Sequence, residues 1–191
     1  RNSTPNFNPL GTPKTITTVE DALFLASYNT ANLNCNWVTG ALSSAGLQTR
    51  AADLQIATDS SIYIAGYFAG NITFPNLPTN VSVGGKDMLV ARFWSNGAPS
   101  FASSWGGPGD DGINSMLLGN GAVYINGYCS SNFDFDPSAG STIWPGQGGT
   151  DWVSAVYSQN IPLPVTWNTF TAELNKNNQT DLSWSTAAEK N

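Results

Sequence analysis

The sequence contains no histidine, the side chain that most often serves as a general base or binds zinc at neutral pH. Without it, a Ser-His-Asp triad, a Cys-His pair and a His-ligated zinc site cannot be built from this chain. The two cysteines, Cys35 and Cys129, are isolated and form no zinc-ligand pair. The glycines lack the Lys-Ser/Thr pattern of a phosphate-binding loop. We therefore expect no enzyme activity and no obligatory cofactor.

Charge is also scarce, since 10% of the residues are charged against roughly 25% in an average soluble domain. The net charge is −6, and the seven Lys and Arg residues form no cluster. Nucleic-acid binding needs such clusters to neutralise phosphates. No apolar run approaches the about 20 residues of a membrane-spanning helix. We expect neither a nucleic-acid partner nor a membrane span.

The polarity of the chain comes instead from Asn, Ser, Thr and Gly. These residues favour turns and exposed strand faces, whereas the Lys, Glu and Ala typical of surface helices are few. The composition therefore predicts an all-β fold.

A repeated segment supports this prediction. Residues 62–67 (IYIAGY) return about sixty residues later as residues 123–128 (VYINGY). Each copy follows a strand-like run and then a turn of residues that tolerate tight bends. The runs are residues 54–57 and 116–118, and the turns are residues 59–61 and 119–121. Each copy therefore predicts a hairpin. Four tyrosines at equivalent places are expected to pack one sheet on the next: Tyr63, Tyr67, Tyr124 and Tyr128.

A second element occurs three times, at residues 7–25, 74–91 and 135–155. It begins with Phe and a nearby Pro and reaches an Asp just before an apolar strand. The three acids are Asp21, Asp87 and Asp151. Because each Asp recurs with the repeat, we expect these acids to help build it.

The two elements together predict about four strands per period of roughly sixty residues, as in a β-propeller blade. A four-stranded sheet with two apolar faces is stable only between neighbours. Residues 1–160 would hold about two and a half such blades, too few to close a ring of about four to eight.

After residue 160 the pattern changes. Residues 161–165 (IPLPV) read as a linker, and residues 169–186 as a hairpin with alternating sides. We interpret residues 161–191 as a linker and the start of a β-sandwich domain. The opening RNSTP has no starting Met or apolar signal region, so we expect the chain to be a piece of a larger protein.

Several segments resemble the bacterial SBBP-type β-propeller repeat. They are residues 62–67, 84–93, 105–111 and 123–128. The FDP at 135–137 and the Gly-Gly-x-Asp elements are similar to the version in large secreted proteins of Bacteroidetes. Residues 163–165, 170–172 and 182–189 resemble the immunoglobulin or fibronectin-like segment that often precedes a type IX secretion signal. The resemblance implies export to the cell surface or beyond, and no defined activity.

Carboxylates are the remaining candidates for chemistry. Asp110 and Asp111 lie in a Gly-rich stretch, and Asp134 and Asp136 flank Phe135. Paired acids can bind calcium or hydrolyse glycosides. Because Asp also caps turns through its side chain, we favour a structural role, with calcium as the first alternative and catalysis as the second.

Trp94 and Trp144 have no aromatic counterpart in the other repeats, which makes them candidates for contact with a ligand such as a glycan. Cys35 and Cys129 are expected to be two buried thiols, with a disulfide as the alternative.

We conclude that the sequence predicts a non-catalytic structural or adhesive module of a large secreted or cell-surface bacterial protein. Its partners would be other blades or subunits, or surface glycans. One alternative is an accessory propeller of a secreted hydrolase whose catalytic domain lies outside this chain. Another is a subunit of a surface protein complex.

Overall fold

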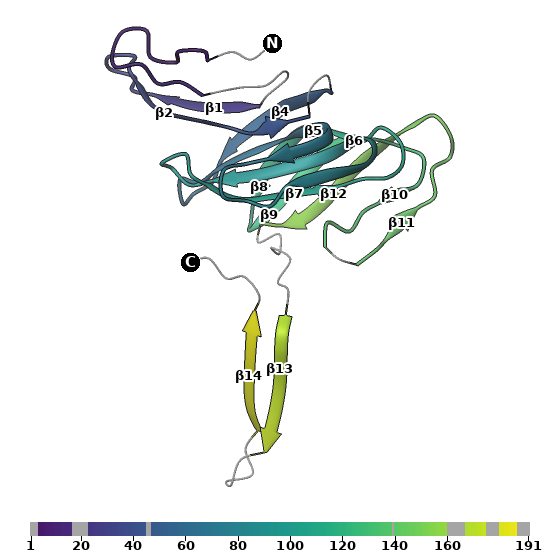
Figure 1. Ribbon diagram of the computed structural model, residues 1–191. Coiled ribbons are helices and arrows are strands. Elements are labelled where there is room, and N and C mark those ends of the chain that lie inside the picture. The colour runs from purple at the N-terminus through teal and green to yellow at the C-terminus, as the bar shows by residue number, and fades with distance from the viewer. Residues whose placement is uncertain are drawn as a thin grey trace. The chain divides into compact units, whose positions relative to one another are not determined.

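The computed structural model describes residues 4–16, 23–44, 47–138, 140–159, 167–174 and 180–186, the last two ranges as backbone only. These residues form fourteen strands and no helix (Figure 1). The strands are β1 (Phe24–Tyr28), β2 (Cys35–Gly40), β3 (Leu42–Ser43), β4 (Thr49–Ile56), β5 (Ile62–Thr73), β6 (Asn80–Phe93), β7 (Pro99–Trp105), β8 (Gly112–Gly119), β9 (Ala122–Ser130), β10 (Phe133–Asp134), β11 (Ile143–Trp144), β12 (Thr150–Ser158), β13 (Trp167–Leu174) and β14 (Thr180–Thr186). The all-β prediction is confirmed.

The chain divides into two compact units, Arg1–Ile161 and Pro162–Asn191. In the second unit, β13 and β14 pair as an antiparallel hairpin. Residues 175–179, between the strands of the predicted hairpin, lie outside the described residues. The same holds for the motif at 163–165, the end of the motif at 182–189 and Asp21.

The centre of the first unit is a five-stranded antiparallel sheet, in which β4, β5, β6 and β7 follow one another and β3 pairs with the far end of β5. The predicted hairpin of β4 and β5 is confirmed. Its turn is held by Asp59, whose Oδ1 accepts hydrogen bonds from the backbone N–H and the hydroxyl of Ser61. Ser60 adopts a φ of 66°, the left-handed conformation that such tight turns require.

A three-stranded antiparallel sheet of β8, β9 and β12 follows, and its predicted β8–β9 hairpin is also confirmed. Asn120 and Gly121 form its turn with φ of 52° and 72°, as an Asn-Gly hairpin turn demands.

The two sheets repeat an irregularity as well as a hairpin. β4 has a bulge between Ala51 and Asp53, opposite Gly66 of β5. β8 has one between Ile113 and Ser115, opposite Gly127 of β9. A Cβ on Gly66 would overlap the backbone carbonyl of Arg50, and a Cβ on Gly127 would overlap that of Gly112. The two copies of the repeat therefore share the same bulged backbone as well as similar sequences.

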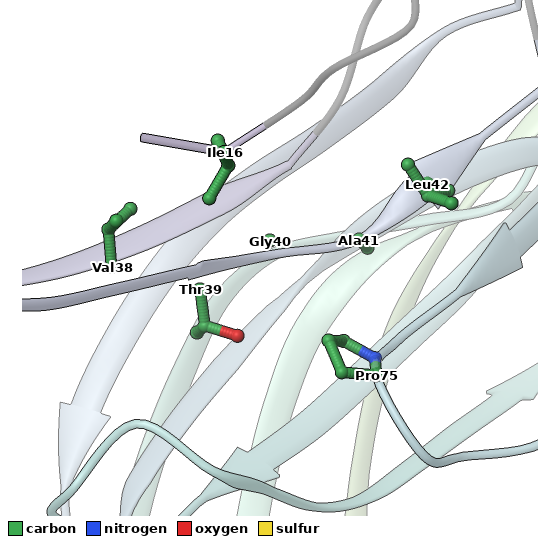
Figure 2. Close-up of a pocket in the computed structure, with 7 residues that line it drawn as sticks. All are labelled: Ile16, Val38, Thr39, Gly40, Ala41, Leu42 and Pro75. Carbon is green, nitrogen blue, oxygen red and sulfur yellow. The ribbon is translucent and has the colours of Figure 1, made fainter. Parts of the chain in front are cut away.

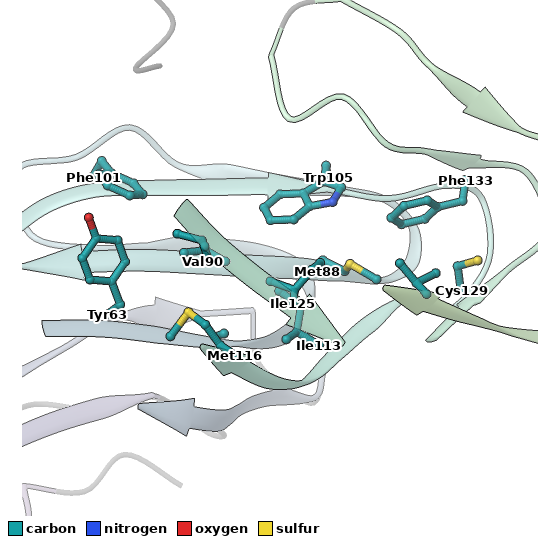
Figure 3. Packing of buried hydrophobic residues seen from close by; sticks show 13 residues of the cluster. Tyr63, Met88, Val90, Phe101, Trp105, Ile113, Met116, Ile125, Cys129 and Phe133 are labelled. Atoms are coloured by element: carbon teal, nitrogen blue, oxygen red, sulfur yellow. The ribbon is translucent and has the colours of Figure 1, made fainter. Parts of the chain in front are cut away.

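Two apolar clusters show how the sheets stack. One lies between the central sheet and the β8–β9–β12 sheet (Figure 3). Its buried members are Tyr63, Ala65, Met88, Val90, Phe101, Trp105, Ile113, Met116, Val123, Ile125, Cys129, Phe133 and Val153. The other lies between the central sheet and the β1–β2 hairpin. Its buried members are Leu23, Leu25, Ala41, Ile64, Phe68, Ile72, Phe74, Leu89, Ala91 and Phe93.

The central sheet is thus covered on both faces along β5 and the second half of β6, while Leu54 and Ile56 of its edge strand β4 remain exposed. Along β6, Met88 and Val90 enter the first cluster while Leu89 and Ala91 enter the second, as the alternation of a strand requires. Burial on both faces explains why its two central strands read as continuous apolar runs.

The prediction of four strands in each repeat is wrong in detail. The central sheet has five strands, because the short β3 extends its edge. The next sheet has three among the described residues, β8, β9 and β12. Among the described residues the sheets do not close into a ring. Cys35 and Cys129 are both free and buried, so the alternative of a disulfide is wrong.

Candidate functional site

The β8–β9–β12 sheet has one face in the first cluster and the other exposed. On the exposed side, Leu117 and Val156 both stand opposite Tyr124, and Trp152 stands opposite Tyr128. The exposed fractions are 61% for Leu117, 60% for Val156, 38% for Tyr124 and 76% for Trp152. We call Leu117, Tyr124, Trp152 and Val156 the outer face.

A pocket of about 310 Å³ lies at one end of β12. Trp144 and Trp152 line it together with Asp151 and Ser154, as do Cys129, Phe135 and Val153. The indole N–H of Trp152 donates a hydrogen bond of 2.9 Å to the Ser154 hydroxyl. Asp151 is the one carboxylate in this lining, so the pocket lacks the pair of acids that glycoside hydrolysis uses. Two indoles and a few polar groups suit binding rather than catalysis.

A second pocket of about 290 Å³ lies beside β2 and β3, against Pro75 (Figure 2). Figure 2 shows a lining of aliphatic side chains with Thr39 as the polar side chain among the labelled residues. With no titratable group in this lining, it offers neither an acid nor a base.

Trp94, the other predicted ligand contact, lies at the end of β6, away from the pocket lining. The guanidinium of Arg92 stands 4.4 Å from its ring centroid. Arg92 also forms an ion pair of 2.6 Å with Asp59. One face of Trp94 is therefore occupied by a cation from its own sheet.

Asp110 and Asp111 lie in the loop between β7 and β8 and have different surroundings. Asp110 is exposed, and its carboxylate accepts hydrogen bonds of 3.1 Å from both the backbone N–H and the Nζ of Lys86. Burial alone would raise its pKa, but the bonds and charge of Lys86 outweigh that effect and lower it.

Asp111 is fully buried. Its Oδ2 accepts a hydrogen bond of 2.7 Å from Gly107 N–H, and its Oδ1 accepts one of 3.0 Å from Ser130 N–H. Burial raises the pKa of Asp111, and the two N–H donors offset part of that rise. The side chain therefore joins the loop to β9.

Asp134 and Asp136 organise the loop around β10. Asp134 Oδ1 accepts hydrogen bonds from the N–H groups of Asp136 (3.0 Å) and Thr142 (2.8 Å), and Asp136 Oδ1 accepts one from Ser138 N–H (2.8 Å). Burial raises the pKa of Asp134, but these N–H donors and Ser141 outweigh it and lower the pKa. Both acids thus make the backbone contacts expected of turn residues.

In the part of the chain that the structure describes, no three His, Cys, Asp or Glu side chains gather as a metal-binding group. Calcium binding at the four acids remains a prediction. Asp110 and Asp111 tie their loop to β6 and β9, whereas Asp134 and Asp136 bond the backbone of their own loop. The structure places Trp144 in a pocket with Asp151 and Trp152 instead.

Sequence reasoning assigned Asp87 to building the repeat and did not foresee its burial beside Asp111. Asp87 is 1% exposed. Its Oδ2 accepts a hydrogen bond of 3.0 Å from Val83 N–H, while its Oδ1 has no hydrogen-bond partner among the described residues. Burial raises the pKa of Asp87 to about 6; the Val83 hydrogen bond opposes this rise and the charge of Asp111 adds to it. The Gly-Gly-x-Asp spacing was the signal that could have singled it out.

The chain has a local similarity to a bacterial protein. No family model matches the sequence. No helix among the described residues is long and apolar enough to cross a membrane. A segment of 104 residues, half of this chain, is 27% identical to the regulatory protein FlaEY of the bacterium Caulobacter vibrioides. The chain covers 11% of the length of that protein, so this is a local similarity to a bacterial protein.

Proposed function

We propose that this chain is a non-catalytic structural or adhesive module of a large, exported bacterial surface protein. Its sheets act as propeller-type blades that need a neighbour on each face. The outer face carries this proposal, because it leaves four large apolar side chains open on the last sheet, whereas the equivalent residues of the central sheet, Tyr63 and Met88, are buried. Contiguous exposed apolar surface of this kind marks a contact site in soluble proteins.

Other observations support the proposal. The sequence offers no histidine, and the carboxylates of the loops are engaged with backbone N–H groups. The local similarity to a bacterial protein agrees with a bacterial origin. The resemblance to SBBP-type repeats supports export and a position outside the cell, with residues 161–191 as the start of an immunoglobulin or fibronectin-like segment before a type IX secretion signal.

The test is surface labelling of intact cells of the source bacterium with an antibody raised against this chain. We expect labelling of intact cells, and loss of the signal after brief protease treatment that leaves a cytoplasmic marker uncleaved. If the antibody reacts only after the cells are lysed, the chain lies inside the cell and the proposal is wrong.

The pocket supports glycan binding as the second candidate, since indole rings provide flat apolar surfaces for ligands. We expect Trp144→Ala and Trp152→Ala to abolish retention of the chain on a glycan array. Trp94→Ala is a matched control, because Trp94 is 47% exposed and Trp144 is 49% exposed. Equal loss in all three variants would argue against a site in the pocket. Glycan binding would also favour an accessory role beside a hydrolase domain.

A further inference from the structure

One face of the central sheet is covered by the next sheet, whereas the equivalent outer face of the β8–β9–β12 sheet is exposed. Tyr63, Met88 and Val90 are each at most 2% exposed, because the β8–β9–β12 sheet packs over them (Figure 3). The repeat relates Met88 to Trp152, each the residue after the Asp of a Gly-Gly-x-Asp motif. Trp152 is 76% exposed. Equivalent positions are therefore buried in one sheet and open in the next.

A second contact holds the edge of the covered face. The loop at residues 106–111 lies along Gly84, Gly85 and Lys86 of β6. Gly85 N–H donates to Gly109 O (3.0 Å), and Asp111 N–H donates to Lys86 O (2.6 Å). A Cβ on Gly84 would overlap the carbonyl of Pro108. The glycines of the motif thus allow the loop of the next sheet to approach the backbone.

The second copy of the motif has the same internal contact, but no loop lies along it among the residues that the structure describes. Asp151 Oδ2 accepts a hydrogen bond of 3.2 Å from Gln147 N–H, as Asp87 Oδ2 does from Val83 N–H. Yet a Cβ built on Gly148 or Gly149 would meet no atom within 4 Å.

The backbone of the two copies also differs. Gly148 and Gly149 have φ of 88° and 69°, and they separate β11 from β12. Gly84 and Gly85 have no positive φ and lie inside the continuous strand β6. The two glycines of the motif are therefore extended in the first copy, which the loop at residues 106–111 covers. They are left-handed in the second copy, which no described residue covers.

We propose that the outer face and residues 148–151 form a docking site for a further sheet of this same repeat. This inference rests on the proposed function and names the partner. The incoming sheet carries a loop like residues 106–111, with glycines where the loop passes close to residues 148 and 149. A carbonyl of this loop accepts a hydrogen bond from Gly149 N–H, and one of its backbone N–H groups donates to Thr150 O. On docking, residues 145–149 become extended and join β11 to β12, as in β6.

The experiment inserts one more repeat into the complete chain. A copy of residues 95–158 is placed between Ser158 and Gln159, so that the second unit is retained. Val156→Cys, made in the original repeat only, reports on the outer face, since Val156 is 60% exposed and the native thiols Cys35 and Cys129 are 3% and 1% exposed. Val83→Cys, at a position that is 73% exposed and not duplicated, is the matched control.

We expect the thiol of the Val156→Cys variant to react rapidly in the parent chain and at least about tenfold more slowly in the extended chain, because burial excludes the reagent. The control thiol should react equally in both. Equal reactivity of the Val156→Cys thiol in both chains, when circular dichroism shows the insert to be folded, overturns the proposal. Slow reactivity in the parent chain together with a dimeric mass would mean that a second copy covers the face, which also overturns it.

A peptide of residues 103–113 provides a second measurement if the insert fails to fold. Added to the isotope-labelled parent chain, it should shift the amide resonances of Gly148, Gly149 and Thr150 and leave Gly121 unchanged. Gly121 is a suitable control because it also has positive φ and open space around it. No shift at millimolar peptide overturns the proposal. Surface labelling of cells does not depend on either result, so the proposed function can fail or hold separately.

Discussion

The carboxyl groups of Asp87 and Asp111 approach the same point beside Gly106, although Asp87 belongs to β6 and Asp111 to the loop before β8. A Cβ on Gly106 would lie 2.8 Å from Asp87 Oδ1 and 2.8 Å from Asp111 Oδ2. Both side chains are buried, and Lys86, the nearby cation, pairs with Asp110. Two buried acids this close favour retention of a proton on one of them.

The first prediction concerns the pH dependence of stability. The pKa of Asp87 rises from 3.8 to about 6 on folding. Between about pH 4 and 6 the unfolded chain therefore loses this proton before the folded chain does, and stability falls as pH rises. Asp87→Asn should remove this loss, because its amide stays neutral and can donate to Asp111. We expect the variant to be more stable than the parent by about 3 kcal/mol at pH 8, with little difference at pH 4.

Denaturant unfolding at pH 4, 5, 6 and 8 measures this difference. Asp110→Asn is the control: the folded-state pKa of Asp110 is lowered, so its stabilisation is lost as pH falls and the slope should have the opposite sign. A constant difference between the parent and Asp87→Asn at all four pH values would show that Asp87 keeps its ordinary pKa.

The second prediction compares the neighbouring acids. Asp111→Ala leaves two N–H donors, of Gly107 and Ser130, without their acceptor in a buried place. We expect a loss of about 2–4 kcal/mol, since unsatisfied buried groups are costly. Asp110→Ala should cost less than about 1 kcal/mol, because an exposed ion pair contributes little. Thermal unfolding of both variants measures the contrast, and equal losses would contradict it.

The third prediction concerns the glycines opposite the bulges. Gly66→Ala and Gly127→Ala should each destabilise the chain by about 1–3 kcal/mol, because the added methyl forces the opposite strand to move. Gly119→Ala is the control, since its added Cβ would have one neighbour, at 3.9 Å. Chemical denaturation measures all three. If the control loses as much as the other two, strand glycines are needed in general and the bulge is not the reason.

The repeat made much of this fold predictable. The hairpins of β4–β5 and β8–β9 follow from apolar runs on either side of turn residues, which are local signals. The bulges could not be predicted, because the register shift depends on how Ala51 and Ile113 pair with a strand later in the chain.

Equivalent residues also acquire unequal surroundings. Tyr63 and Tyr124 hold the same place in the repeat, yet Tyr63 is 2% exposed and Tyr124 is 38% exposed. The sequence of one repeat cannot reveal whether the next sheet covers it. The contact between Asp87 and Asp111 escaped prediction for a related reason, since it depends on how a loop from one sheet docks on another.

The last prediction tests which face of the sheets is covered, using two tryptophans. Trp105 is 4% exposed in the first cluster, and Tyr157 stacks edge-on against it with ring centroids 5.0 Å apart. Trp105→Ala should cost about 3–5 kcal/mol through lost burial and the cavity it leaves. Trp152→Ala, at a 76% exposed position, should change stability by no more than about 0.5 kcal/mol. Unfolding of the complete chain at low concentration measures both values. A large loss for Trp152→Ala would mean that the outer face is already covered within a single chain, so that it could not serve as a docking surface.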